Sequence, residues 1–329
     1  DYRGWDIFDG LNSRLFQATP LAKSRFCRLA WIQFFKKSPV NFRSIARVPK
    51  GHNSKGLGLF ASALLRLGKP KEAEDLLLKL LKMRSSGYGG WSWGYNFDWQ
   101  AKAFFVPKGK PNMVTTVFVA QAFLDAYART KNAKWLEPAK GACRFIREHL
   151  LLEPGPCFGY IPGESARVHN ANMLGAALLG KVYGLTGEKR LYDLSKAAMG
   201  YSMGALDEDF SWPYGERDHH RFVDNFHTGF NLVALKDWMD ATDDRRWEKQ
   251  LDGAYRYFLD TFWLADGCPR YYHDGLYPID IHCSAQGIVT CVMLQDHDPG
   301  SLNMAQKMAR WTIDHMQDPE GFFYYQKTR

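Results

Sequence analysis

An internal repeat constrains the fold of this chain more than any other feature of its sequence. Apolar segments rich in small residues recur along the chain, and their equivalent points, Thr115, Asn170, Asn225 and Ile281, are almost evenly spaced. These segments, of which NANMLGAALLGKVYGL (residues 170–185) is one, carry almost no charge, as is typical of helices buried on all sides. Self-similarity at a period of about 55 residues predicts structural units that stack against one another.

Helices of a second kind alternate with the apolar segments. GKPKEAEDLLLKLLKM (residues 68–83) has charges on one face and leucines on the other, which predicts a surface helix. A turn rich in Gly, Pro and aromatic residues precedes each apolar segment, as in DFSWPYGE (209–216), and DPEGFFYYQ (318–326) begins what reads as a truncated last repeat.

One polar-faced helix and one apolar helix per repeat predict an all-α fold, an (α/α) toroid of about five to six helical hairpins in which outer helices surround inner ones. An ordinary α-solenoid is the alternative, but its helices should each keep one solvated face. We expect residues 1–329 to form a single catalytic domain, with residues 1–50 as a loop-rich extension packed on the barrel.

Polar residues gather where the apolar helices begin. If the inner helices all run in the same direction, their N-termini meet at one end of the barrel together with the aromatic turns. The polar candidates there are Thr115, Thr116, His169, Asn170, Asn172, Asp224, Asn225, His227, Asp280, His282 and Ser284, and the aromatic candidates are Trp91, Trp93, Trp99, Trp212, Tyr214, Tyr271, Tyr272 and Tyr277. Helix N-termini favour anions and aromatic faces suit sugar rings, so the pattern predicts a cleft for an acidic carbohydrate.

Structural roles compete with this interpretation. Asn170, Asn225 and Asp280 are good N-cap residues, and Thr115 and Thr116 are expected to be caps rather than ligands. The tryptophans of the turns could equally pack between repeats. His169 and His227 are harder to explain by capping or packing.

Proton abstraction beside a carboxylate is the first chemistry that these residue types suit. It needs a base, for which His227 or His169 is the candidate, and Tyr214 would act from the opposite face of the sugar. Asp224 completes the predicted catalytic set. The residues expected to hold the substrate are Trp91, Trp93, Asn170, Asn172, Trp212, Asn225, Tyr271, Asp280 and His282.

The second chemistry is glycoside hydrolysis, which requires two carboxyl groups. Asp224 and Asp280 are the best pair for it, with Glu164 or Glu216 in reserve.

Composition excludes several other classes of protein. The six cysteines form no CxxC pair and no zinc-site spacing, so we expect no metal, no cofactor and reduced core thiols. The net charge of +8 favours an acidic partner. Because no long Lys/Arg run occurs, we interpret this excess as thinly spread and expect no nucleic-acid partner.

Localisation follows from two features of the sequence. No apolar run reaches the roughly 20 residues of a membrane-spanning helix. A cytoplasmic location is expected, and a periplasmic one stays open because the chain starts at Asp1, without Met, as it would after removal of a signal peptide.

Several motifs together resemble a known family. They are GWDIFDGLNS (4–13), SPVNFR (38–43), GGWSWGYNFDWQ (89–100), NANMLGAALL (170–179), WPYG (212–215) and VDNFHTGFNLVAL (223–235). This set resembles proteins encoded in bacterial and archaeal surface-polysaccharide biosynthesis clusters, over residues 4–286. The resemblance implies an (α/α) toroid and a role in making or tailoring a polysaccharide or glycan. The helical domain of glucuronyl C5-epimerases is similar in architecture and also has a His-containing helix late in the domain, but no β-rich N-terminal part like theirs is expected here.

The sequence therefore predicts an enzyme that modifies an acidic, uronate-containing oligo- or polysaccharide, either a uronate C5-epimerase or a related β-eliminating lyase. An (α/α)6-type glycoside hydrolase is one alternative. A non-catalytic glycan-binding component of a polysaccharide-synthesis complex is the other. The oligomeric state stays open.

Overall fold

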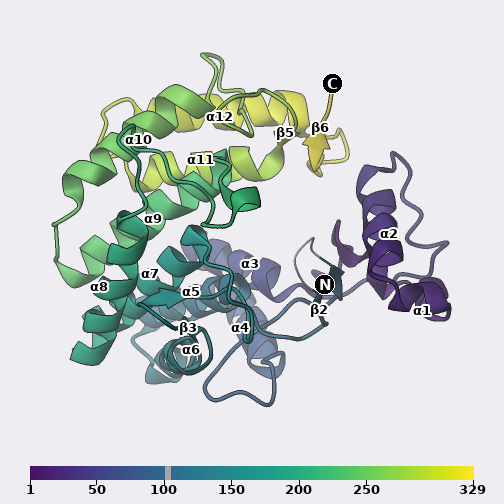
Figure 1. The fold of residues 1–329 in the computed structure, drawn as a ribbon, viewed down its shortest axis with the longest axis horizontal. Helices are drawn as coiled ribbons and strands as arrows, with labels where there is room; N and C mark the ends of the chain where they lie inside the picture. The colour runs from purple at the N-terminus through teal and green to yellow at the C-terminus, as the bar shows by residue number, and fades with distance from the viewer. Residues whose placement is uncertain (101–104) are drawn as a thin grey trace. The chain divides into compact units, whose positions relative to one another are not determined.

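Helices dominate the computed structural model, which describes residues 1–100 and 105–329 (Figure 1). The α-helices are α1 (Arg14–Gln17), α2 (Arg25–Lys37), α3 (Ser54–Arg66), α4 (Pro70–Lys82), α5 (Met113–Thr130), α6 (Leu136–His149), α7 (His169–Thr186), α8 (Lys189–Met203), α9 (Asn225–Thr242), α10 (Glu248–Phe262), α11 (Ile281–Met293) and α12 (Ser301–Met316). Short 3₁₀ helices are η1 (Asp9–Asn12), η2 (Pro20–Lys23), η3 (Ala133–Trp135) and η4 (Asp218–His220). The prediction of an all-α chain is confirmed.

Strand structure in the described residues is confined to antiparallel pairs of two-residue strands. The pairs are β1 (Trp99–Gln100) with β2 (Phe105–Val106), β3 (Leu151–Leu152) with β4 (Cys157–Phe158), and β5 (Ile279–Asp280) with β6 (Gln326–Lys327). Five of these strands lie in connections between helices and β6 follows α12, so they shape loops rather than form a sheet layer.

The chain divides into two compact units. The first unit contains residues 1–150 and 161–163, and the second contains residues 151–160 and 164–329. The expectation of one domain over residues 1–329 stays a prediction.

Two helical hairpins, α3–α4 and α5–α6, make up much of the first unit, and α3 packs on both α4 and α5. Gly58 permits this close packing, because a Cβ at this position would lie 3.0 Å from the carbonyl oxygen of Phe118. Leucines of α3 and α4 form the core with Phe123 and Trp93. Residues 1–50, expected to be rich in loops, contain α1, α2 and two 3₁₀ helices, held in part by a buried ion pair in which Arg43 Nε lies 2.7 Å from Asp9 Oδ1.

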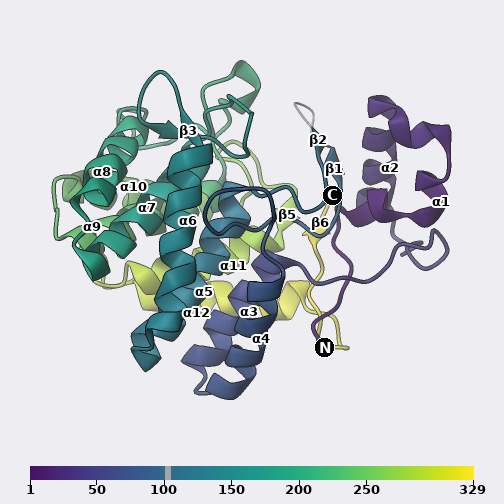
Figure 2. The same ribbon diagram turned by 90° about the horizontal axis from the view of Figure 1, so that it is seen from below.

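The second unit is built from the hairpins α7–α8, α9–α10 and α11–α12. α9 packs against both α7 and α11, and α11 and α12 run side by side in Figure 1 and Figure 2. Burial distinguishes inner from outer helices, because 13 of the 18 residues of α7 are buried against 6 of the 15 of α8. The predicted alternation of apolar and polar-faced helices is therefore present.

The inner helices begin at a constant interval. α5, α7, α9 and α11 start at Met113, His169, Asn225 and Ile281, which are equally spaced along the chain. Each sequence-based equivalent point lies at, or within one or two positions of, the helix start that it marks.

Backbone hydrogen bonds join the beginning of each inner helix of the second unit to the next turn along the chain. The first N–H of α7 donates to the Tyr214 carbonyl at 3.0 Å, that of α9 to the Tyr271 carbonyl at 2.9 Å, and that of α11 to the Tyr325 carbonyl at 3.1 Å. The first N–H groups of a helix have no partner within the helix, so the aromatic turns satisfy them. The N-termini of α7, α9 and α11 consequently lie at one end of the second unit.

The helix caps correct part of the sequence interpretation. Asn112, not Thr115 or Thr116, caps α5, and its Oδ1 accepts a hydrogen bond from the Thr115 N–H at 2.8 Å. Asn170 and Asn225 are not caps either, because both already lie in the first turn of their helices, whereas an N-cap residue has non-helical backbone angles. Asp280 does cap α11, as its residue type indicated.

Two further properties of the described residues bear on the sequence expectations. All six cysteines are free thiols, and all but Cys27 are buried. None of the described helices combines the length and apolar character that crossing a membrane requires.

Candidate active site

Asp224 and His227 form a buried acid–imidazole pair at the start of α9. The Asp224 carboxylate accepts the His227 backbone N–H at 3.0 Å, and its Oδ2 lies 2.7 Å from His227 Nδ1. The Asp224 side chain is fully buried, whereas 21% of the His227 side chain is exposed. A buried anion beside Nδ1 selects the Nδ1–H tautomer, which leaves the lone pair on Nε2. The pair thus has the arrangement of a general base with its orienting carboxylate.

Asp280 and His282 form a second pair at the start of α11. Asp280 Oδ1 accepts the His282 backbone N–H at 2.8 Å and lies 2.8 Å from His282 Nδ1. Its other oxygen accepts a hydrogen bond from Gln326 Nε2 at 2.6 Å, across the β5–β6 pairing. The Asp280 side chain is buried and that of His282 is half exposed. The contacts of the first pair, in which a capping carboxylate also lies beside the His Nδ1, are therefore repeated at the start of the next inner helix.

The ring of Phe226 lies against both imidazoles. Its centroid is 4.1 Å from that of His227 and 6.0 Å from that of His282. Tyr271 approaches the same ring at 5.7 Å, and Tyr214 lies 4.5 Å from the His227 ring. The two Asp–His pairs and the aromatic turns therefore form one cluster.

Tyr271 is an uncharged phenol in this cluster. Its pKa is raised above the ordinary tyrosine value by burial, and further by the negative charges of Asp224 and Asp280. Its ring centroid lies 5.7 Å from that of Phe226, which also contacts both imidazoles, so Tyr271 lies beside both pairs. It can donate a hydrogen bond but is unsuited to act as a base at neutral pH.

His169 and Asn172 lie in a separate buried network. His169 Nδ1 is 3.1 Å from Ser202 Oγ, and burial lowers the pKa of its imidazole below the ordinary value. Asn172 Nδ2 donates to the Ala198 carbonyl at 2.6 Å and to Ser202 Oγ at 2.8 Å, while its Oδ1 accepts the Phe158 N–H at 2.8 Å. Asn172 thus ties α7 to α8 and β4 with its amide group engaged, which corrects its expected role as a substrate ligand.

Burial also corrects the expected stacking roles of two tryptophans. Trp93 is completely buried and its Nε1 donates to the Leu80 carbonyl at 2.8 Å. Trp212 is 2% exposed and donates to the Ser202 carbonyl at 3.0 Å. Neither ring offers a face to a sugar. Trp91, half-buried in the first unit, packs against Trp93 with centroids 6.1 Å apart.

The predicted asparagines at the helix starts are likewise buried. Asn225 Nδ2 donates to the Arg270 carbonyl at 3.1 Å and to the Phe262 carbonyl at 3.4 Å, which fastens the turn before α11 to α9. Asn170 lies in the first turn of α7 and is 4% exposed. The reserve carboxylates are engaged as well, Glu164 with Arg217 at 2.8 Å and Glu216 with the Tyr201 hydroxyl.

Sequence reasoning overlooked three residues of the cluster. Phe226 lies between two residues that it did select, but an apolar side chain in an apolar helix gives no signal of its own. Gln326 and Tyr325 lie in the last aromatic turn, which the sequence showed only as a truncated repeat. The available signal was that Tyr325 and Gln326 lie in a Gly/aromatic turn like those that precede the inner helices.

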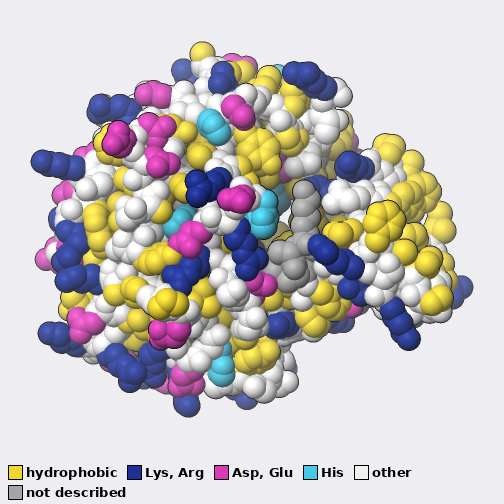
Figure 3. Space-filling view, viewed as in Figure 1, with side chains coloured by type: hydrophobic (Ala, Val, Ile, Leu, Met, Phe, Trp, Pro, Cys, Tyr) yellow, Lys and Arg dark blue, Asp and Glu magenta, His cyan; other side chains and the backbone are white. Residues whose placement is uncertain are grey.

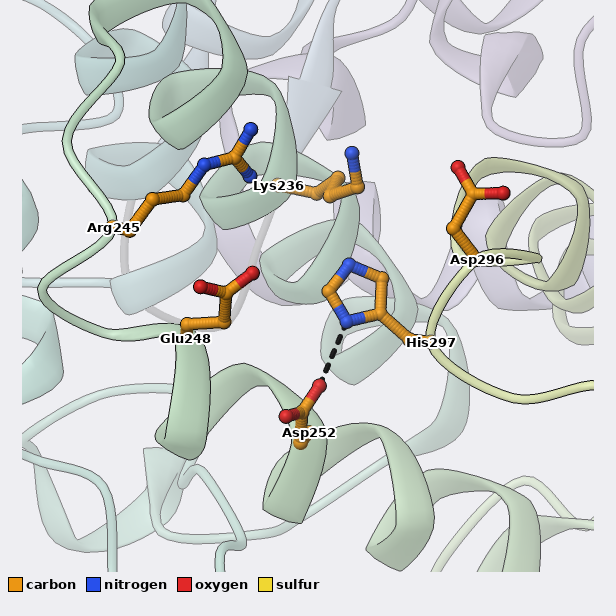
Figure 4. A pocket seen from close by; sticks show the side chains of 6 residues that line it. All are labelled: Lys236, Arg245, Glu248, Asp252, Asp296 and His297. Atoms are coloured by element: carbon orange, nitrogen blue, oxygen red, sulfur yellow. Dashed lines mark hydrogen bonds and ion pairs between the residues drawn. The ribbon is translucent and has the colours of Figure 1, made fainter.

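A charged pocket lies away from this cluster, near the other end of α9 (Figure 4). Its lining residues are Lys236, Arg245, Glu248, Asp252, Asp296 and His297, and His297 Nδ1 is 2.7 Å from Asp252 Oδ1. Lys236 lies three turns after the start of α9, about 16 Å along the helix axis. Lys236 and Arg245 both pair with Asp240. Much of its charge is thus internally compensated, and we do not assign the chemistry to this pocket.

Metal ligation has no support among residues 1–100 and 105–329. No group of three or more His, Cys, Asp and Glu side chains there could hold a metal ion.

Comparisons with known proteins relate the fold, but not the sequence, to carbohydrate enzymes. No family model matches this sequence, and no curated protein matches it significantly. A sugar epimerase from a ruminal bacterium has a TM-score of 0.64 at 15% identity, over 86% of this chain and 82% of its own.

Two further solved structures match over a similar extent. Cellobiose 2-epimerase from Bacillus thermoamylovorans has a TM-score of 0.67 at 12% identity, over 86% of this chain and 82% of its own. An unsaturated glucuronyl hydrolase specific for heparin has a TM-score of 0.64 at 12% identity, over 85% and 80%. At these identities the similarity shows the fold alone. The resemblance inferred from the motifs is confirmed at that level, and the fold of this chain is an (α/α) toroid of the kind found in carbohydrate-active enzymes.

Proposed function

We propose that this chain is a carbohydrate-modifying enzyme that epimerises a sugar residue by transferring a proton at carbon. One observation carries the proposal. Two imidazoles, each oriented by a buried carboxylate, contact the same ring of Phe226. Solved structures with this fold include proteins named as epimerases of sugars.

His227 acts as the base in the proposed reaction. Its Nε2 takes the proton from a carbon next to a carbonyl or carboxyl group, and the electron pair of the broken C–H bond moves onto that group. Asp224 stabilises the imidazolium that forms. Tyr271, an uncharged phenol in the field of both pairs, donates a hydrogen bond to the oxygen that gains charge.

His282 returns a proton to the opposite face of the same carbon, which inverts its configuration. Asp280 and Gln326 hold His282 in place for this step. Tyr214 is the alternative proton donor on that face, as the sequence suggested, but its ring packs 4.5 Å from that of His227. We therefore give Tyr214 the role of orienting the base and contacting the sugar.

A uronate residue of an acidic oligo- or polysaccharide is the substrate class that we favour. The N-termini of α7, α9 and α11 lie at the same end of the second unit. Asp224 and Asp280 cap α9 and α11, whereas α7 has no side-chain cap, so the positive end of the α7 dipole favours a carboxylate. The C5 proton of a uronate adjoins that carboxylate, so binding and chemistry would use one group. A related lyase would share the first step and then eliminate the C4 substituent.

Hydrolysis is less well supported by the same contacts. Asp224 and Asp280, the best carboxylate pair for a glycosidase, are buried and bound to histidines. Glu164 and Glu216 are engaged with Arg217 and Tyr201. Two free carboxyl groups across a glycosidic bond are what a hydrolase requires.

Proton exchange tests the proposal directly. We would incubate the protein with uronate-containing and neutral oligosaccharides in D₂O and follow loss of the C5 proton signal by NMR. Exchange with appearance of the second epimer is expected for a uronate. Absorbance of an unsaturated uronate would indicate a lyase, and new reducing ends without exchange would contradict the proposal. Binding without exchange, absorbance or cleavage would instead favour a non-catalytic glycan-binding component.

Single substitutions separate the two bases. His282→Gln should stop epimerisation but retain exchange at C5 of one epimer, because His227 can still remove and return a proton on its own face. His227→Gln should show the converse with the other epimer. His315→Gln, on an exposed part of α12, is the matched control. Loss of exchange with both epimers in both variants would contradict a two-base mechanism.

A further inference from the structure

The positive charge of this chain is concentrated near its beginning, which corrects the interpretation that it is thinly spread. Residues 14–50 contain nine Lys and Arg and no Asp or Glu. Since the whole chain has 43 basic and 35 acidic residues, the remainder has 34 basic and 35 acidic. The net charge of +8 therefore arises from this segment alone.

The same segment exposes large apolar side chains. Phe26 is 79% exposed and Ile45 is 72% exposed, and Leu15, Leu21, Phe34 and Val40 are also exposed. Figure 3 shows hydrophobic and basic side chains together over the part of the view where Figure 1 places α1 and α2. A single exposed apolar residue needs no explanation, but a group of them in a segment with nine Lys and Arg and no Asp or Glu marks an interaction surface.

The arrangement of α2 explains why these side chains are exposed. Its inner face packs Ile32 and Phe35 into two small apolar clusters whose buried members all lie within residues 11–48, and Trp31 stacks on Phe16 with centroids 4.9 Å apart. Phe26 and Phe34 are two i, i+4 steps apart and so lie on one helix face, and both are exposed. The helix is thus held by one side and presents aromatic rings on the other, next to exposed Arg25 and Lys37.

We propose that the exposed face of residues 14–50 binds the surface of an anionic lipid bilayer. Apolar side chains enter the boundary between headgroups and acyl chains, while Lys and Arg remain among the anionic headgroups. Each such cation strengthens the partition by about fivefold near an anionic surface. The contact would place the chain at a membrane through a surface-binding face.

Other binding partners would match either the positive charge or the apolar side chains of this face, but not both. A nucleic acid or a soluble acidic glycan would pair with the cations but would leave Ile45, Val40 and Leu21 without an apolar partner. A second copy of the chain would bring two surfaces of the same charge together, which repel each other. An anionic bilayer matches both the charge and the apolar side chains.

Vesicle sedimentation with the full chain tests the proposal. Binding to phosphatidylcholine vesicles that contain phosphatidylserine is expected to exceed binding to phosphatidylcholine alone, and to weaken as salt is added. Phe26→Ser should lower the partition by roughly tenfold, since burial of a Phe side chain is lost. Lys37→Glu should lower it by more than about fivefold, because one cation is replaced by an anion.

Matched variants control for nonspecific effects. Leu67→Ser removes an apolar side chain that is 73% exposed at the end of α3, and Lys189→Glu reverses an exposed charge on α8. Both should bind vesicles as the unaltered chain does, and circular dichroism should show all four variants to be folded. Arg43 is left unchanged because it is buried against Asp9.

Several results would overturn the proposal. One is equal binding to vesicles with and without phosphatidylserine. Another is binding to DNA or to soluble polyuronate that Phe26→Ser leaves unchanged, with no binding to vesicles, since the face would then be a polyanion site. Self-association that Phe26→Ser abolishes, again without vesicle binding, would assign the face to a second copy.

Discussion

His227 Nδ1 lies 2.7 Å from Asp224 Oδ2, and the same carboxylate accepts the His227 backbone N–H. One buried carboxylate thus caps α9 and orients the imidazole. Capping and the proposed catalytic role, which seemed to be competing explanations of Asp224, are therefore compatible with each other in one side chain. Substitutions at Asp224 and His227 separate the two effects.

His227→Gln should abolish epimerisation, and exchange at C5 of the epimer whose proton His227 removes, while the protein stays folded. Loss of a general base lowers the rate by about 10²–10⁴-fold. The substitution leaves the cap intact, because the backbone N–H still reaches Asp224, so the free energy of unfolding should change by less than about 1–2 kcal/mol. Exchange rates and urea unfolding measure the two quantities, and a large loss of stability would mean that the histidine is structural.

Asp224→Asn and Asp224→Ala should differ in stability but not in activity. Asn caps helices as well as Asp, whereas Ala at an N-cap costs about 0.5–2 kcal/mol. Neither residue carries the charge that stabilises the His227 imidazolium, so in both variants exchange at C5 of the epimer whose proton His227 removes should slow by about 10²-fold or more. Activity retained in Asp224→Asn would show that the carboxylate serves only as a cap.

Asn172→Ala should destabilise the protein by about 2–4 kcal/mol, since removing a buried amide leaves its partners unsatisfied. Its amide makes hydrogen bonds with the Ala198 carbonyl, Ser202 Oγ and the Phe158 N–H. Asn303→Ala, on the exposed side of α12, should change the unfolding free energy by less than about 0.5 kcal/mol. A stable Asn172→Ala protein with weakened substrate binding would restore its predicted role as a ligand.

His169 should make stability depend on pH below about 6.5, the unfolded value. Its folded pKa is lowered by burial, so above that pH the imidazole is neutral in both states and its contribution is fully present. As the pH falls, the unfolded chain takes up the proton first, and stability decreases by up to about 1.4 kcal/mol per pH unit until the folded pKa is reached.

His169→Gln should reduce that slope, because Gln can still bond to Ser202 but does not titrate. Urea unfolding at a series of pH values between about 7.5 and 5, which brackets the unfolded pKa, measures it. His315→Gln, where the ring is exposed, should leave the slope as it is. Identical slopes in the unaltered chain and in His169→Gln would mean that His169 does not cause the loss of stability at low pH.

The local sequence by itself determined where the helices form and which of them are buried. The alternation of apolar and polar-faced helices follows from side-chain periodicity, and its regular interval survives in the structure as equal spacing between the starts of the inner helices. Asp224 and His227 lie within one helical turn of each other, so their pairing at a helix start is a short-range event that a sequence can specify. For the same reason all four residues of the two Asp–His pairs were candidates from the sequence, Asp224 and His227 for catalysis and Asp280 and His282 for substrate binding.

Tertiary packing decided the rest. Whether Trp212 stacks on a sugar or fills the core depends on what lies beneath it, and the carbonyl of Ser202, at the end of the preceding helix, takes its indole N–H. Asn172 became a tie between α7, α8 and β4 because its partners Phe158, Ala198 and Ser202 converge only in the folded chain. Gln326 reaches Asp280 from the far end of the last hairpin. Periodicity and capping act over a few residues and are legible in the sequence, whereas burial and long-range hydrogen bonds require that distant segments first be brought together.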